Sequence, residues 1–463
     1  MADLIGVPPE AHPTAARKPI SEGMDQAAGG IPVGGPEGGE PASAPPGTVP
    51  APDPDDGRLT PFAGTPDWRS AFAALLVAQV TSMVAFGMAL PFLPLYVQRL
   101  GVADEASAAR WAGAMSTAGM LVMAIVAPVW GDLADRYGRK PMVVRACFGG
   151  GLIVGAMSFV RTPLELLGLR TVQGAFSGTV AATRTLVVSV VPTSQLGFSL
   201  GLLQTAVFVG NSLGPLVGGV VADAAGYEAT FLVTAALLGV AGLVVLGFVR
   251  EQFTPPVRGG RDGARHGWRD ALMLLRDTPG LGAVIVTLFF VSTAQNAMGP
   301  VLPLFVKHLV DDAHAPVASL AGLVIGIAAV TSALAAAGAG RLGDRWGHGR
   351  LMAACAIAGG VTYLPQAFVT GPYELMAWRA VLGLFTGGLM PGTMALVALQ
   401  TPARHRGWVF GLTTTATALG GAVGPIAGAA AATTLGLRAT FVVTGTILTI
   451  AGAWAARSER RRR

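Results

Sequence analysis

Long apolar stretches separated by short polar loops dominate the chain from about residue 70 onwards. A helix needs about 20 mostly apolar residues to cross the hydrocarbon core of a bilayer. The stretches that meet this requirement are residues 71–98, 109–130, 141–161, 164–189, 197–221, 229–249, 281–306, 318–339, 351–370, 373–398, 406–432 and 438–456. The pattern therefore predicts an all-α membrane protein with twelve transmembrane helices.

A repeat divides these helices into two groups of six. The charged loop at residues 131–140 returns in weakened form at 340–350, an offset of 209 residues that persists far outside the loop. At this offset, or at 210 after a one-residue slip, the matches include Pro91 with Pro300, Asp135 with Asp344, Arg170 with Arg379, Gly214-Pro215 with Gly424-Pro425 and Phe231 with Phe441. A polar phrase that recurs once per half indicates two pseudo-symmetric six-helix bundles of the same orientation.

Composition marks where the bundles begin and end. Residues 1–68 are rich in Pro, Gly, Ala and Glu and lack the apolar segment of a signal peptide, so we expect a disordered N-terminal tail. The two bundles are predicted at 69–250 and 281–457. The linker at 251–280 carries an apolar stripe that fits either a short interfacial helix or a plain connection, and residues 458–463 form a basic C-terminal tail.

The charge distribution indicates membrane topology rather than a nucleic-acid partner. Only 13% of the residues are charged, against about 25% in a typical soluble domain, and mean hydropathy is +0.57. The net charge of +6 reflects Lys and Arg in the loops at 131–140 and 340–350, the linker and the C-terminal tail, whereas the opposite loops are poor in them. The excess of basic residues on one side predicts a multi-pass protein of the cell (inner or plasma) membrane with both termini in the cytoplasm.

The side-chain chemistry argues against an enzyme. The two cysteines lie in different predicted spans, and the six histidines show no metal-ligand spacing. The sequence has no nucleophile–base pair and no GxxxxGK[ST] phosphate loop. We therefore expect no metal and no cofactor, and transport driven by a gradient rather than by ATP.

Three motifs resemble those of the major facilitator superfamily. Residues 131–140 match its motif A, G-x-x-x-D-R-x-G-R-[KR]; residues 170–178 resemble motif B, in span 4; and residues 210–219 resemble motif C, in span 5. The resemblance covers nearly everything from about residue 70 to the end. Motif C narrows the resemblance to the twelve-span drug:proton antiporters of the multidrug efflux type.

Motif A is, by this resemblance, a conformational latch that holds the outward-facing state. The residues assigned to it are Gly131, Asp132, Asp135, Arg136, Gly138, Arg139 and Lys140, with Asp344 and Arg345 in the second copy. A simple positive-inside anchor is the alternative, and it explains the arginines but not the aspartate, the glycines or their recurrence. Because Arg341 replaces the counterpart of Asp132, we expect a weaker second latch.

Arg170 is the candidate for proton coupling, together with Gln173 and Glu165. An arginine inside a span is costly and normally faces an interior cavity with a partner, and the resemblance implicates motif B arginines in coupling. An arginine that snorkels to the periplasmic edge is the alternative. Asp132 and Asp135 are further candidates to carry the proton.

Motif C is a strip of small residues that comprises Gly210, Gly214, Pro215, Gly218 and Gly219. Glycines four residues apart allow another helix to approach closely. In the family the strip is thought to seal the periplasmic side between spans 5 and 8. Ordinary packing of small residues is the alternative.

The substrate path is expected between the bundles, near the membrane midplane. The candidate lining residues are Gln79, Met83, Phe86, Gln204, Phe208, Asn211, Gln295, Asn296, Phe385 and Met390. As a set they predict a mostly apolar cavity with uncharged hydrogen-bonding groups, although each one alone also fits core packing. Span 1 has no central Asp or Glu, so we do not expect selective binding of cationic drugs.

The predicted function is secondary active export of small amphipathic or hydrophobic molecules, drugs or metabolites, by proton antiport with alternating access. The partners expected are a small-molecule substrate, protons and the lipid bilayer, without nucleic acid, for a protein that acts as a monomer. Import of a metabolite by the same fold is one alternative, and motif C argues against it. A non-transporting receptor or scaffold is the other, and the intact motifs A, B and C argue against that.

Overall fold

The computed structural model describes residues 68–251, 279–310, 312, 314–389, 392–393, 396–397 and 406–460. Within these ranges every regular element is a helix. The elements of the first half are α1 (Trp68–Ala89), η1 (Leu90–Phe92), α2 (Leu93–Arg99), α3 (Glu105–Tyr137), α4 (Lys140–Ala156), η2 (Met157–Phe159), α5 (Pro163–Phe176), α6 (Thr179–Val190), η3 (Thr193–Gln195) and α7 (Leu196–Phe248). Those of the second half are α9 (Pro279–Ala297), α10 (Leu302–His308), α11 (Val317–Trp346), α12 (His348–Gln366), α13 (Pro372–Thr386), α15 (Arg406–Leu435) and α16 (Leu437–Arg460). The predictions for the N-terminal tail up to residue 67, for the linker helix, for residues 461–463 and for Met390 fall outside the described residues, whereas residues 458–460 of the predicted C-terminal tail continue α16.

The twelve predicted spans in two six-helix bundles are confirmed. Eight stretches of the described chain are long and apolar enough to cross a membrane by themselves. One of them, Thr193–Phe248, contains two predicted spans, because α7 changes direction at Gly226, where a φ of +88° favours glycine. Span 4 consists of α5 followed by α6, and α12 and α13 carry spans 9 and 10.

The internal repeat also holds for tertiary contacts. Tyr96 packs on Phe231 with ring centroids 5.0 Å apart, and their counterparts Phe305 and Phe441 pack at 4.7 Å. Gly226 and its counterpart Gly436 both have φ near +90°. Equivalent residues therefore make equivalent contacts in the two bundles, as a duplicated unit should.

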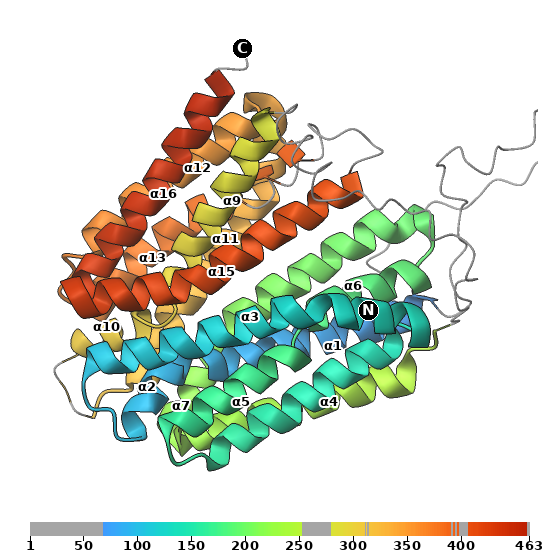
Figure 1. Ribbon diagram of the computed structural model, residues 1–463, viewed down its shortest axis with the longest axis horizontal. Helices are drawn as coiled ribbons and strands as arrows, with labels where there is room; N and C mark the ends of the chain where they lie inside the picture. The colour runs from blue at the N-terminus through green and yellow to red at the C-terminus, as the bar shows by residue number, and fades with distance from the viewer. Residues whose placement is uncertain are drawn as a thin grey trace, which may run out of the picture. The chain divides into compact units, whose positions relative to one another are not determined.

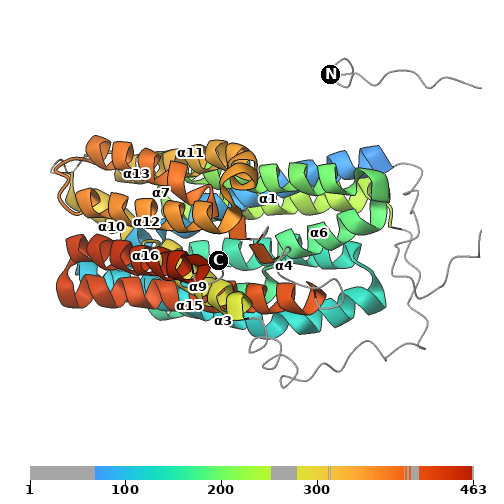
Figure 2. The same cartoon turned by 90° about the horizontal axis from the view of Figure 1, so that it is seen from above.

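The bundles meet along two helix pairs. Helix α15 runs beside α3 (Figure 1; Figure 2), and α11 contacts α7. One large apolar core contains buried residues of both halves, including Phe92, Met115 and Phe305. A second core, built around α1, α4, α6 and the start and end of α7, contains residues of the first half only. The halves thus share a core at one end, whereas at the end that holds motif A the first half has a core of its own.

Candidate functional site

Two glycines allow the halves to touch at the end opposite motif A, which we call the closed end. A Cβ at Gly113 of α3 would lie only 2.8 Å from the Pro425 carbonyl oxygen of α15. Its counterpart Gly322 of α11 is even closer to the Pro215 carbonyl of α7. The two contacts are equivalent by the repeat, and each needs a glycine because the neighbouring atom is backbone.

Polar bonds reinforce the closed end. The Thr117 hydroxyl donates to the Ala422 carbonyl across the halves at 2.6 Å. The Asp223 carboxylate of α7 accepts the backbone N–H groups of Ala318 at 3.1 Å and Ser319 at 2.7 Å, in the first turn of α11. Helix α11 has no side-chain cap at its own N-cap residue, a proline, so Asp223 supplies a cap from the other half.

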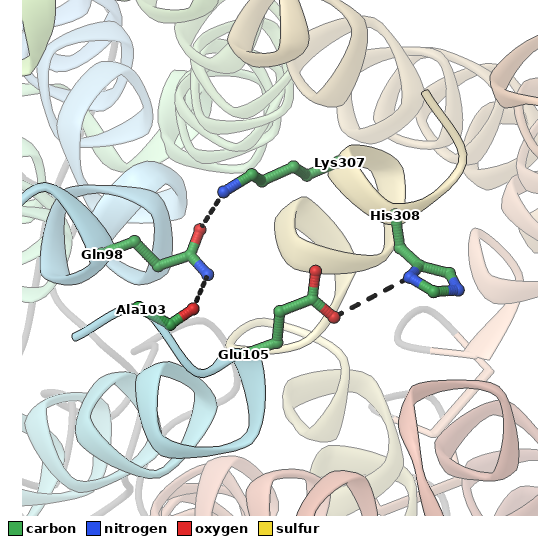
Figure 3. A network of polar contacts seen from close by, with 5 residues as sticks. All are labelled: Gln98, Ala103, Glu105, Lys307 and His308. Carbon is green, nitrogen blue, oxygen red and sulfur yellow. Dashed lines mark hydrogen bonds and ion pairs between the residues drawn. The ribbon is translucent and has the colours of Figure 1, made fainter. Parts of the chain in front are cut away.

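Further polar contacts join α2 and the start of α3 to α10 at this end (Figure 3). Lys307 of α10 donates to Oε1 of Gln98 of α2 at 2.8 Å, and Gln98 in turn donates to the Ala103 carbonyl at 3.4 Å. His308 Nδ1 lies 3.9 Å from a carboxylate oxygen of Glu105. Gln98 and Lys307 are 209 residues apart and occupy equivalent positions in the two repeats. Because equivalent residues of two related bundles can touch only where the bundles face each other, their bond marks the interface between the halves.

Towards motif A the same helix faces are uncovered. On α3, the face that touches α15 through Gly113 and Thr117 continues, at spacings of three and four residues, through Ala124 and Pro128 to Asp135, and these three are exposed. On α11 the corresponding face continues to Asp344, which is also exposed. The described halves are therefore closed at one end and separated at the other.

Motif A lies at the end of the molecule where the halves are apart. Arg136 pairs with Asp132 at 2.7 Å, whereas Asp135 is exposed and has no bonded partner among the described residues. Gly138, with a φ of +97°, turns the chain into α4. Gly131 is exposed and borders open space. In this conformation Arg136 is therefore paired within its own helix, and Asp135 stays free of the described residues.

A residue that the sequence analysis missed anchors the loop. The backbone N–H groups of Arg139 and Lys140 donate to the Glu251 carboxylate at 2.9 and 2.7 Å, at the N-terminus of α4. The Lys140 ammonium donates to the Leu246 carbonyl at 2.8 Å. An acidic residue directly after the last apolar stretch of the first bundle was the available signal, because carboxylates favour helix N-termini.

The second copy of the motif keeps only part of this arrangement. Gly347 turns the chain with a φ of +90°, as Gly138 does. Asp344 lies 3.2 Å from Nε2 of His348, and Arg345 is exposed. The aspartate therefore pairs with a residue of its own loop.

In motif B, the Arg170 guanidinium donates to Oε1 of Gln173 one turn later, and Gln173 donates to the Ser177 hydroxyl at 3.1 Å. Gln173 is buried and Arg170 half-buried. Glu165 is exposed and accepts the Arg161 N–H at 2.8 Å at the start of α5. The structure thus brings Arg170 and Gln173 together, while Glu165 acts as a helix cap.

Motif C serves two interfaces. Gly210, Gly214 and Gly218 lie against Met83, Gly87 and Met88 of α1, within the first bundle, whereas Pro215 and Gly219 contact α11, which is span 8. The glycines at 210, 214 and 218 therefore pack on span 1, whereas Pro215 and Gly219, together with Ser212 and Leu216, face span 8. The interval of four residues is compatible with this close packing but does not identify the partner helix.

The candidate substrate-lining residues of the first half divide between packing positions inside the first bundle and the α7 face that leads to α11. Gln79 and Met83 are buried where α1 packs on α7, and Phe86 packs towards Gly150 of α4. By helical register, Gln204 and Phe208 share the α7 face that contacts α11 further along, with exposed Asn211 beside them.

In the second half the candidates are half-buried. These are Gln295, Asn296 and Phe385. Asn296 donates to the Ser292 carbonyl at 2.8 Å and borders Gly424, and Phe385 lies near Gly359. Within the part of the chain that the structure describes, His, Cys, Asp and Glu side chains form no cluster that fits a metal ion.

Comparison with known proteins identifies relatives along most of the chain. The family model described as Major Facilitator Superfamily matches residues 75–313 and 308–463. The multidrug resistance protein MdtG of Serratia proteamaculans is 32% identical over 82% of this chain and 91% of its own length. The protein of the same name from Salmonella typhimurium is 30% identical over 86% of this chain and 97% of its own.

Solved structures share the fold at low sequence identity. A bacterial homologue of the human lysosomal transporter Spinster, in an inward-facing and unoccupied conformation, superposes with a TM-score of 0.68 at 14% identity and covers 86% of this chain and 98% of that one. A mutant of the nucleoside transporter NupG gives 0.68 at 13% identity, with 84% and 99% covered. At this identity the likeness concerns the fold alone.

Proposed function

Because the chain belongs to the major facilitator superfamily, we propose that it exports small amphipathic or hydrophobic molecules by proton antiport with alternating access. Relatives named multidrug resistance proteins, aligned over more than 80% of the chain, support the substrate class. The observation that carries the mechanism is the contrast between the two ends: glycine contacts and cross-half bonds join the bundles at one end, while the continuing faces of α3 and α11 are exposed at the other. Alternating access requires such a pair of interfaces, of which one is made and the other released.

The basic loops assign the two ends to compartments. Arg136, Arg139 and Lys140 lie at the motif A end, as do Arg345 and Arg350 of the second copy. The positive-inside rule supports a cytoplasmic location for this end and for both termini. The described conformation is then open to the cytoplasm, the state that loads substrate for export. In the outward-open state Asp135 would meet the second half and form the motif A latch.

Proton coupling rests on motif A and motif B in this proposal. Asp135 lies exposed on the α3 face that continues towards α15, so its protonation state can bias closure of that end. Arg170, held by Gln173, is a charge inside span 4 that responds to the same movement. The protein acts as a monomer on a small-molecule substrate and on protons, and needs no nucleic acid.

Reconstituted vesicles test the proposal. An imposed pH gradient should drive accumulation of a fluorescent amphipathic dye, and a protonophore should abolish it. Arg170→Ala should lose accumulation, whereas Arg161→Ala, an exposed arginine in the loop before the same span, should keep it. Accumulation that ignores the protonophore would exclude proton coupling, and vesicles that move no amphipathic dye would exclude export.

A further inference from the structure

The charges inside the membrane spans all have one sign. By sequence, no Asp or Glu lies more than one turn inside any of the twelve spans, whereas Arg145, Arg170, Arg184 and Arg379 do. A buried ion without a counter-ion is costly, and an ionisable residue within a span is a functional-site candidate by default. None of the four arginines has a carboxylate partner among the described residues.

Three of the four are half-buried or buried against neutral neighbours. The Arg145 guanidinium lies 3.6 Å from the centre of the Trp130 ring. Arg170 is bonded to Gln173, as described above. Buried Arg379 lies 5.8 Å from the centre of the Tyr363 ring. Stacking and amide bonds of this kind hold a guanidinium in place but do not neutralise its charge.

Arg184 differs because its guanidinium is exposed on the open side of the first bundle. It donates one bond to Oε1 of Gln204, on the α7 face that leads to the α11 contact. A guanidinium has five N–H donors in a planar fork, so most of them remain free for a second acceptor. Apolar groups lie beside it: Val188, one turn along α6, is 45% exposed, and Phe208 is half-buried one turn beyond Gln204.

We infer that Arg184 is a specificity-determining residue that binds the head group of an amphipathic organic anion, a carboxylate or a sulfonate. The planar fork matches these head groups in a bidentate manner, and Val188 and Phe208 take the apolar body. The arginines inside the spans favour an anion and oppose a cation, because no carboxylate offsets them there. This inference rests on the proposed export function, since it names the substrate class of that transporter.

Three probes with one apolar body test it: pyrenebutyrate, pyrenebutanol and a pyrenylbutyl-trimethylammonium salt. Uptake into inside-out vesicles under a pH gradient gives KM for each probe. The wild type should prefer the carboxylate. Arg184→Gln should raise KM for pyrenebutyrate at least about tenfold and leave KM for the alcohol within about twofold, because a bond to a charged group is lost for the anion alone.

Matched variants separate binding from folding. Arg184→Lys keeps the charge and should retain most of the preference for the carboxylate even though the fork is lost. Arg161→Gln removes an exposed arginine outside the open face and should change none of the three KM values. A wild type that prefers the ammonium probe, or an Arg184→Gln variant that changes all three KM values equally, overturns the inference. If the alcohol and ammonium probes accumulate but pyrenebutyrate does not, the inference fails and export stands; if no probe accumulates, the proposed function itself fails.

Discussion

Asp223→Asn should release the closed end. The aspartate caps α11 from the opposite half through two bonds, at 3.1 and 2.7 Å, and both exist only while the halves meet there. Asparagine keeps one acceptor oxygen but loses the negative charge and the second acceptor. An exposed charge at a helix N-terminus contributes about 0.3–1 kcal/mol and a hydrogen bond about 0.5–1.5 kcal/mol.

The two losses together amount to about 1–2 kcal/mol against the state that is closed at this end. A difference of this size changes the ratio of the two conformations by roughly 5- to 30-fold. Because the interaction is an exposed charge near a helix end, the effect should shrink as ionic strength rises. The expected direction is towards the conformation in which motif A is closed.

Distances between spin labels report the ratio of the two conformations directly. Cys147 and Cys355 are both buried and can be replaced by alanine, which leaves labels only at introduced cysteines. Labels at Arg161 and Tyr373, exposed positions in opposite halves, give one distance distribution per conformation. The Asp223→Asn variant should show a larger share of the longer distance.

Asp104→Asn is the matched control. Asp104 makes the same kind of cap, at 2.7 Å to the Ser107 N–H, but within its own half. Its replacement should leave the distance distribution unchanged. An Asp223→Asn distribution identical to that of the wild type, or an equal change in both variants, would refute the assignment of Asp223 as a tie between the halves.

Three further outcomes are expected from the same end of the molecule. Gly322→Ala should prevent closure and lower transport in vesicles, because its Cβ would overlap the Pro215 carbonyl, whereas Gly338→Ala on the same helix meets open space and should transport normally. Thr117→Val loses the 2.6 Å bond to an α15 carbonyl, worth about 0.6–1 kcal/mol, and should change the conformational ratio about three- to fivefold in the spin-label assay. Hydrogen bonds to the Asp104 carboxylate hold its pKa below the ordinary value. The stabilisation from Asp104 is therefore complete above the unfolded-state pKa and is lost as pH falls through the lower folded-state pKa. Thermal unfolding measured between neutral and acidic pH should show a loss of stability on the acid side, and Asp104→Asn should reduce that loss.

The helices were predictable because the bilayer imposes a length and a composition on every span. Each predicted span coincides largely with helix, apart from short non-helical breaks such as 177–178 and 298–301, and the change of direction at Gly226 separates two spans at the expected place. The repeat predicted further structure, since Gly138 and Gly347 turn the chain in the same way. The spans and the glycine turns depend on short stretches of sequence, and the second half repeats those stretches.

Contacts between distant segments were not predictable from the same pattern. The bond from Arg139 to Glu251 joins residues 112 apart, and the Thr117 bond to Ala422 joins residues 305 apart. A spacing of four residues shows that a strip of α7 is small and smooth, but α1 and α11 both fit such a strip. The periodicity of a single helix shows which residues share a face, but it does not show how whole bundles pack. The choice between α1 and α11 as the partner depends on that packing.

Whether the motif A latch is made or released could also not be predicted from the sequence. Its sequence fits a latch, yet a latch is made in one conformation and released in the other, and a sequence is common to both. In the described conformation the exposed Asp135 carboxylate lies on the face of α3 whose opposite end already touches α15 through Thr117. A rigid α3 that rocks about the closed end would carry Asp135 towards the second half and strain the Thr117 bond at the other end. In the proposed mechanism Asp223 and Asp135 therefore act in opposition: the cap that Asp223 places on α11 would favour the state in which Asp135 is free, and a bound Asp135 would favour the state in which Asp223 is released.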